Sequence, residues 1–213
     1  MKSQSETRKS RASKGRSTRR RILFAHSAGP QGDREGSGFL VASLRRGLGR
    51  GYDVRYPIMP DPDDPVYAPW RDRLEKELAA LADGAVLVGH SLGGSVLLKL
   101  LSERKPGKRV PRFAGLFLVA TPFWGPEGWG VDEFRLRKDI AARLPRIPRL
   151  VLCHSRDDDE VPFAHLGLYA RALPQATVRE LDGHGHLFEN GCRELVEEIA
   201  GAAGDAPRVV HGS

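Results

Sequence analysis

A serine flanked by glycines is the residue whose setting most directly indicates chemistry. Ser91 lies in the segment Gly-His-Ser-Leu-Gly at 89–93, which fits the pattern G-x-S-x-G. An apolar run at 85–89 predicts a buried strand before it, and the apolar spacing at 92–103 predicts a helix after it. In that context a serine occupies a tight, strained turn with its hydroxyl exposed, and the glycines avoid collisions with nearby backbone. We therefore predict that Ser91 is a nucleophile, and the alternative is an ordinary serine at the start of a helix.

A serine hydroxyl is a poor nucleophile unless a nearby base takes its proton, and a histidine is the expected base. His184 and His186 lie directly after the last predicted strand, where a base can reach across the end of the sheet. We predict His186 as the base, because it precedes the final helix and Gly185 permits a turn, and His184 is the alternative. The other histidines after Ser91 lie at a strand end, within a predicted helix and in the C-terminal segment: His154, His165 and His211.

A third group must orient the imidazole and stabilise its cation. The segment Arg-Asp-Asp-Asp-Glu at 156–160 follows the fifth predicted strand, so one of its carboxylates is expected to accept a hydrogen bond from the histidine. The residue types alone leave Asp157, Asp158 and Asp159 open, and two of the three belong to a solvated acidic loop.

Backbone N–H groups are expected to stabilise the oxyanion that forms when a serine attacks a carbonyl. The N–H of Leu92, at the start of the helix after Ser91, is the first candidate. The second is expected from the loop His-Ser-Ala-Gly at 26–29, where Ala28 is preferred over Ser27 and His26 braces the loop.

Aromatic residues near the predicted strand ends are candidates for a substrate pocket. They are His90, Phe123 and Trp124. Aromatic side chains at such positions are equally often part of the core, so both interpretations stay open.

The elements that must position these residues alternate between short strands and helices. Strands are predicted at 21–25, 52–56, 85–89, 115–120, 150–154 and 177–181. Helices are predicted at 37–48, 69–82, 92–103, 132–143, 163–173 and 192–203. The strands are apolar on both faces, as parallel strands buried between helices are. We predict an α/β fold: a doubly wound, mainly parallel six-stranded sheet with helices on both faces, which binds its ligand beyond the carboxyl ends of the strands.

Composition and charge divide the chain into a basic tail and a near-neutral body. The chain has 213 residues and a net charge of +7, but residues 1–21 contain nine basic residues and one acidic residue. We predict a disordered tail at 1–20, a folded domain at 21–203 and a flexible C-terminus at 204–213. The tail is an extension without function, a transit peptide, or an arm that contacts nucleic acid or an anionic surface. No secretory signal or transmembrane segment is visible, so a cytoplasmic location is expected.

The cysteines and the histidine pair give little indication of a metal or a disulfide framework. Cys153 and Cys192 are expected to be free thiols, although a single bridge between them stays open. His184 and His186 could chelate a metal, but no further ligand lies close to them in the sequence. We therefore expect no metal and no organic cofactor.

These motifs together resemble the α/β-hydrolase superfamily, and the arrangement is similar to its small members, the retinoblastoma-binding protein 9-like serine hydrolases. The resemblance covers 21–203 and rests on the loop at 26–29, the proline-rich stretch at 59–65 with Trp70, the serine motif, the acidic segment before Val-Pro, and Gly-His at 185–186. It implies a minimal α/β-hydrolase fold and assigns the acid to Asp158, four residues before the proline. It also supports Ser91 and His186.

The combined expectation is a serine hydrolase that cleaves a carboxylic ester, thioester or amide of a small acyl substrate through an acyl-enzyme. A carboxylesterase is favoured over a peptidase, because a small fold with little lid offers few contacts to an extended peptide. The alternative is a hydrolase-fold protein that acts mainly as a binding or regulatory module.

Overall fold

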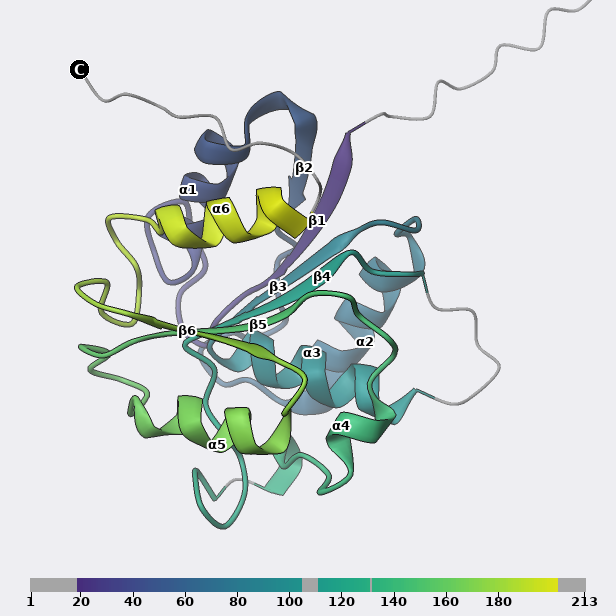
Figure 1. Cartoon of the computed structure of the whole chain (residues 1–213), viewed down its shortest axis with the longest axis vertical. Helices are drawn as coiled ribbons and strands as arrows, with labels where there is room; N and C mark the ends of the chain where they lie inside the picture. The colour runs from purple at the N-terminus through teal and green to yellow at the C-terminus, as the bar shows by residue number, and fades with distance from the viewer. Residues whose placement is uncertain (1–18, 105–110, 131, 203–213) are drawn as a thin grey trace, which may run out of the picture.

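The structure is a computed structural model that describes residues 19–104, 111–130 and 132–202. Within these ranges strands and helices alternate along the chain (Figure 1). The strands are β1 (Arg20–Ala25), β2 (Tyr52–Arg55), β3 (Val86–His90), β4 (Gly115–Val119), β5 (Leu150–Ser155) and β6 (Thr177–Leu181). The α-helices are α1 (Gly38–Leu48), α2 (Tyr67–Ala79), α3 (Leu92–Glu103), α4 (Ile140–Arg143), α5 (Ala164–Ala172) and α6 (Arg193–Ala202).

The strands form one sheet in the order β2-β1-β3-β4-β5-β6, and every neighbouring pair is parallel. Helices α1 and α6 lie on one face of the sheet, and α2, α3 and α5 lie on the other (Figure 1). The predicted doubly wound six-stranded sheet is therefore confirmed, and it is parallel throughout the described residues. Because all strands run the same way, their carboxyl ends meet at one edge.

The core has two layers because alternate residues of each strand face opposite sides of the sheet. In β1, Ile22 and Phe24 pack with α1 and α6, whereas Leu23 and Ala25 pack with α2 and α3. The central strands β3, β4 and β5 are buried along their whole length. This rigid centre carries the turns that follow β3 and β5.

Three expectations need correction. The helix predicted over 132–143 is absent: a short 3-10 turn spans Asp132–Phe134, and α4 begins only at Ile140. Phe134 and Ile140 are the buried residues of those two elements, and a separation of six does not place them on one helical face. Strand β6 is an edge strand with exposed residues, so it is not apolar on both faces. The last residue of the predicted tail, Arg20, begins β1.

The rest of the predicted tail up to residue 18 and the predicted C-terminal segment at 204–213 lie outside the described residues. Among the helices that the structure describes, none has the length and apolar character needed to cross a bilayer.

Candidate active site

Ser91 occupies the predicted turn between β3 and α3. Its φ of 50° and ψ of −124° lie in a region that side chains other than glycine rarely adopt. The turn is held by the Ser91 N–H, which donates to the Val119 carbonyl at 2.8 Å. Ser91 itself accepts from the Gly94 N–H through its carbonyl at 3.0 Å. Strain of this kind persists only when the surroundings impose it, and it is concentrated at functional sites.

The glycine at position 93 is required by a close approach of two backbone segments. A Cβ there would lie 2.4 Å from the His26 carbonyl oxygen and 2.5 Å from the Ala25 carbonyl oxygen. A Cβ at Gly89 would likewise lie 2.5 Å from the Cα of Gly94. Gly93 therefore lets the Ser91 turn pack against the end of β1, and Gly89 lets the start of α3 lie close to β3.

His186 is held by a buried carboxylate. Its Nδ1 donates to Oδ2 of Asp158 at 2.9 Å and to Oδ1 at 3.0 Å. The side chain of Asp158 is 0% exposed and that of His186 is 2% exposed. Because Nδ1 carries the proton, Nε2 of the neutral ring has a free lone pair. That nitrogen is the atom that a general base uses.

The carboxylate of Asp158 is surrounded by donors. Oδ1 accepts from the N–H groups of Val161 at 2.8 Å and Glu160 at 3.0 Å, and Oδ2 lies 3.0 Å from Nε2 of His154. Burial opposes ionisation of this group, but the hydrogen bonds from His154 and His186 outweigh it and hold the pKa of Asp158 well below its usual range. Asp158 is therefore an anion at neutral pH.

The neighbouring aspartates have other surroundings. Asp157 accepts from the hydroxyl of Ser155 and from the N–H groups of Gly183 (2.9 Å) and Gly185 (3.2 Å). These hydrogen bonds, led by the one from Ser155, lower its pKa. Asp157 thus fastens the loop that carries His186, while Asp159 is exposed. Sequence reasoning missed this fastening role, because its partners lie 26 and 28 residues away in the chain.

A buried polar network links His186 to the loop after β1. His90 is 0% exposed; its Nε2 donates to the His186 carbonyl at 2.9 Å, and its Nδ1 lies 2.9 Å from the Ser37 hydroxyl. A carbonyl can only accept, so Nε2 of His90 carries the proton and Nδ1 accepts from Ser37. Burial, followed by the nearby His186, lowers the pKa of His90 to about 3. His90 is therefore neutral, and because it directly precedes Ser91 its hydrogen bond connects the Ser91 turn to the backbone of His186.

His26 holds the loop after β1 in place through its two ring nitrogens. It is fully buried; Nε2 donates to the Gly29 carbonyl at 3.1 Å, and Nδ1 accepts from the Tyr56 hydroxyl at 2.7 Å. Burial lowers the pKa of His26. The expected bracing role of His26 thus has a direct structural basis.

The two candidate oxyanion donors, the N–H groups of Ala28 and Leu92, differ from the N–H of Ser27 in their hydrogen bonds. The Ser27 N–H donates to Ser37 Oγ at 2.9 Å, so it is already engaged. Within the described residues, the N–H groups of Ala28 and Leu92 donate to no backbone carbonyl. Leu92 is the first residue of α3, where the N–H groups of a helix point outward. Both amides are thus available to a ligand.

A cavity of about 460 Å³ lies beside His186. Its lining includes Ala28 and carries one guanidinium and three carboxylates, from Arg34, Glu35, Glu160 and Glu189. Oε2 of Glu160 lies 3.7 Å from Nε2 of His186. His186 and Ala28 therefore line this cavity, whereas Ser91 and Leu92 do not.

The three predicted pocket residues do not line this cavity. His90 is buried in the network described above. Trp124 donates from its indole to Ser95 Oγ at 2.8 Å and packs edge-on against Trp129. Phe123 packs edge-on against Tyr169. The structure brings Phe123 and Trp124 into the core on the α3 and α5 side of the sheet.

The remaining histidines have other partners. His184 contacts Gly191 and Glu194 and not Asp158, so only one of the two alternatives meets the acid. His154 donates to the Val161 carbonyl at 3.0 Å, and His165 accepts from the Phe123 N–H at 2.8 Å. His211 lies outside the described residues.

The comparison with protein families decides the class of this chain. A sequence profile described as serine hydrolase matches residues 53–198, which is more than half of the chain. The chain belongs to the serine hydrolase family. The family description covers serine hydrolases in general and does not single out the retinoblastoma-binding protein 9-like members. No curated protein sequence matches.

Solved structures confirm the α/β-hydrolase fold. The ydeN gene product from B. subtilis superimposes with a TM-score of 0.70 at 20% identity, over 87% of this serine hydrolase and 100% of that chain. A meta-cleavage product hydrolase, CumD from Pseudomonas fluorescens, superimposes with a TM-score of 0.62 at 14% identity, over 86% of this chain and 91% of that chain. A monoacylglycerol lipase from Paleococcus ferrophilus superimposes with a TM-score of 0.60 at 15% identity, over 85% of this chain and 94% of that chain. At these identities the likeness establishes the fold alone.

Proposed function

We propose that this serine hydrolase cleaves a carboxylic ester of a small acyl substrate through a triad of Ser91, His186 and Asp158. The observation that carries the proposal is the hydrogen bond from Nδ1 of His186, a residue that lines the cavity, to the buried Asp158 carboxylate. The strained turn at Ser91 and the link from His90 to His186 support it.

In the proposed reaction, Ser91 Oγ attacks the substrate carbonyl while Nε2 of His186 takes the hydroxyl proton. His186 then gives that proton to the leaving alcohol, and the acyl group remains on Ser91. A water molecule, deprotonated by the same Nε2, attacks the acyl-enzyme, and the carboxylic acid leaves as His186 returns the proton to Ser91 Oγ. Asp158 stays ionised throughout and stabilises the imidazolium.

The N–H groups of Leu92 and Ala28 are proposed to stabilise the tetrahedral oxyanion. Removing one such donor typically costs about 10²–10³-fold in kcat. The proposal favours Ala28 over Ser27, because the Ser27 N–H already donates to Ser37. It needs neither a metal nor an organic cofactor.

The size and charge of the cavity support a small, neutral or cationic ester. A volume of about 460 Å³ falls within the roughly 300–1,000 Å³ of small-molecule sites. Three carboxylates and one guanidinium in its lining disfavour an anionic substrate. Thioesters and amides react by the same steps, and the ester is favoured over the amide because a leaving alcohol depends less on protonation by His186 than a leaving amine does.

A fluorophosphonate probe tests the proposal. We expect covalent labelling of the wild type at Ser91, no labelling of Ser91→Ala, and a fall in ester turnover of at least about 10³-fold in that variant. Ser102→Ala is a matched control: its hydroxyl donates to the Lys99 carbonyl within α3, and it should be labelled normally. If folded wild type were not labelled, or if Ser91→Ala kept more than about a tenth of the activity, the triad would be refuted. The hydrolase-fold binding module would then be the better explanation.

A further inference from the structure

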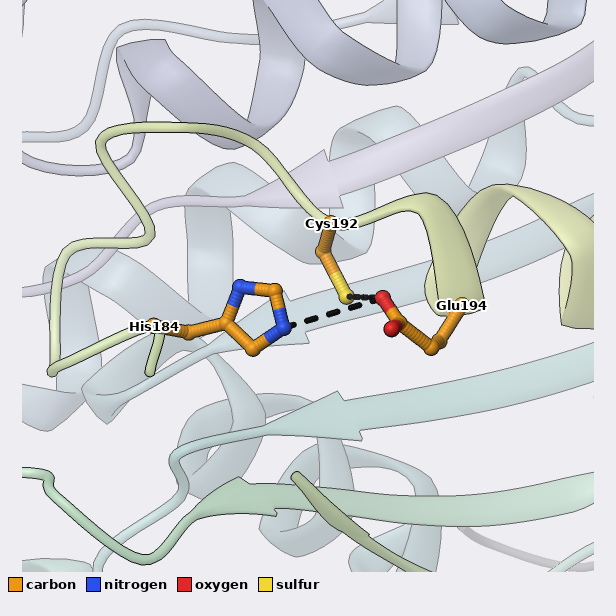
Figure 2. Close-up of side chains that lie close together, drawn as sticks. All are labelled: His184, Cys192 and Glu194. Carbon is orange, nitrogen blue, oxygen red and sulfur yellow. Dashed lines mark hydrogen bonds and ion pairs between the residues drawn. The ribbon is translucent and has the colours of Figure 1, made fainter. Parts of the chain in front are cut away.

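The loop between β6 and α6 brings together three side chains that metals bind. Figure 2 shows His184 from the loop, Cys192 at its end and Glu194 in the first turn of α6 pointing toward one another. Nε2 of His184 lies 3.6 Å from Oε2 of Glu194, and Sγ of Cys192 lies 3.6 Å from the same oxygen. The ligand atoms all lie within 4.8 Å of one another.

We propose that His184, Cys192 and Glu194 form a binding site for a divalent transition-metal cation, with zinc as the best match to the donor set. Zinc in proteins binds cysteine sulfur, histidine nitrogen and carboxylate oxygen. A thiolate ligand selects against magnesium and calcium, which prefer oxygen. The site is separate from the proposed triad, because His184 makes no contact with Asp158.

Two of the three separations between ligand atoms already fit a tetrahedral ion, and the third, between His184 and Cys192, is within 4.8 Å. Zinc lies about 2.3 Å from sulfur and about 2.0–2.2 Å from nitrogen or oxygen. Two such ligands at a tetrahedral angle are therefore about 3.3–3.7 Å apart. The two 3.6 Å separations measured from Oε2 of Glu194 meet this requirement.

The imidazole of His184 is already oriented as a ligand. Its Nδ1 donates to the Gly191 carbonyl at 3.1 Å, which leaves the lone pair on Nε2, the atom that faces Glu194. The ring also stacks on Phe188 with the centroids 5.2 Å apart. A hydrogen bond from the second ring nitrogen to a backbone carbonyl is the usual support of a histidine that binds a metal.

The sulfur of Cys192 is supported at the start of α6. The Leu195 N–H donates to Sγ at 3.4 Å, and this donor together with the positive end of the helix offsets part of the burial that opposes a thiolate at Cys192. In the metal-free protein the thiol donates to Glu194. On binding, the sulfur–metal bond replaces the S–H bond, and the proton leaves to solvent.

The exposed carboxylate of Glu194 gives an ion access to the site from solvent. The Glu194 side chain is 46% exposed and that of His184 is 16% exposed, whereas Cys192 is buried. Three protein ligands leave a fourth position on the solvent side for water. Because His186 lies two residues from His184, the ion would fasten its loop to α6 and so stabilise the fold around it.

From the sequence alone no metal is expected, because His184 and His186 could chelate one but no further ligand lies close to them in the chain. Cys192 and Glu194 lie eight and ten residues beyond His184, and only the turn of the loop brings them to it.

The experiment uses the full chain without a polyhistidine tag. After treatment with a chelator and desalting, Co²⁺ is titrated in, and Zn²⁺ affinity is measured by competition with a chromophoric chelator. We expect one equivalent of metal, a thiolate-to-cobalt charge-transfer band, and a rise in melting temperature with Zn²⁺.

The variants Cys192→Ser, Glu194→Gln and His184→Gln should each weaken Zn²⁺ affinity by more than about tenfold, the lower limit for changes that touch only the support of a ligand. Cys192→Ser should also lose the charge-transfer band. Cys153→Ala and Glu197→Gln are matched controls, since Cys153 is the other buried thiol and Glu197 is another acid of α6. Glu194→Gln changes an exposed side chain, so its fold should be retained. Wild type that binds no Zn²⁺ at equimolar concentration, or a Cys192→Ser variant that binds as wild type does, would overturn the proposal.

Discussion

The buried brace His90 should make this protein lose stability in mild acid. Burial and the nearby His186 lower the pKa of His90 to about 3 in the folded protein, whereas an exposed histidine of the unfolded chain has a pKa of about 6.5. Above about pH 6.5 both states are neutral, so His90 then has no effect on the pH dependence of folding. Between about pH 6.5 and pH 3 the unfolded chain binds one more proton, and stability falls as the pH falls.

The size of the effect follows from the separation of the two pKa values. From about pH 7 to about pH 4.5, the extra proton on the unfolded chain costs the folded state about 3 kcal/mol. Since small proteins are stable by only about 5–15 kcal/mol, a loss of this size is readily measured.

The assay compares wild type with His90→Gln by urea denaturation at both pH values and one ionic strength. Glutamine can donate to the His186 carbonyl and accept from Ser37, but it does not titrate. We expect wild type to lose about 3 kcal/mol more than the variant on acidification. His26, whose pKa burial also lowers, contributes equally to both proteins and cancels. Equal losses in the two proteins, or an NMR titration of His90 near pH 6.5, would refute the reasoning.

Three further outcomes are expected. Asp158→Asn should lower ester turnover by about 10⁴-fold while the melting temperature changes far less, because His186 would no longer be held with its proton on Nδ1. Kinetics and thermal melts of the same preparation test this, and turnover within tenfold of wild type would contradict it. Gly93→Ala should destabilise the fold by about 3 kcal/mol in urea denaturation, the upper end of the usual cost of overpacking, because its Cβ would meet two backbone oxygens. The control Gly167→Ala in α5, where a Cβ would meet no atom within 4 Å, should be neutral or slightly stabilising, and similar values for the two variants would show that the turn can relax. The thiols of Cys153 and Cys192 should not react with a disulfide reagent in the folded metal-free protein at about pH 8, because burial raises the pKa of Cys192 to about 12 and also raises that of Cys153. Rapid reaction of either thiol before unfolding would contradict this prediction.

Features encoded by short stretches of chain were predictable from sequence. The turn at Ser91 follows from a strand, two glycines and a helix within residues 86–103, and these local signals agree with one another. The parallel sheet follows from apolar strands that alternate with helices. The helix predicted over 132–143 was wrong because the apolar residues there suggested one continuous helix, whereas the two that are buried, Phe134 and Ile140, are not on one helical face.

Partners that lie far apart in sequence were decided by the tertiary structure. The pattern of residues left three aspartates open, and the resemblance pointed to Asp158. In the folded protein Asp158 accepts a hydrogen bond from His186, and Asp157 accepts from the N–H groups of Gly183 and Gly185. These partners are 26–28 residues apart in the chain. The same holds for His90, whose two hydrogen bonds span 53 and 96 residues.

The sequence by itself determined the class of fold, the strained serine turn and the sheet edge where polar residues collect. Those features depend on periodicity and on glycine positions, which act over one or two turns of chain. Only the tertiary structure decided which histidine meets the acid, which amides of the β1 loop stay available, and that His184, Cys192 and Glu194 converge. Such pairings are set by how separate loops pack over the sheet edge, and no local pattern records that packing.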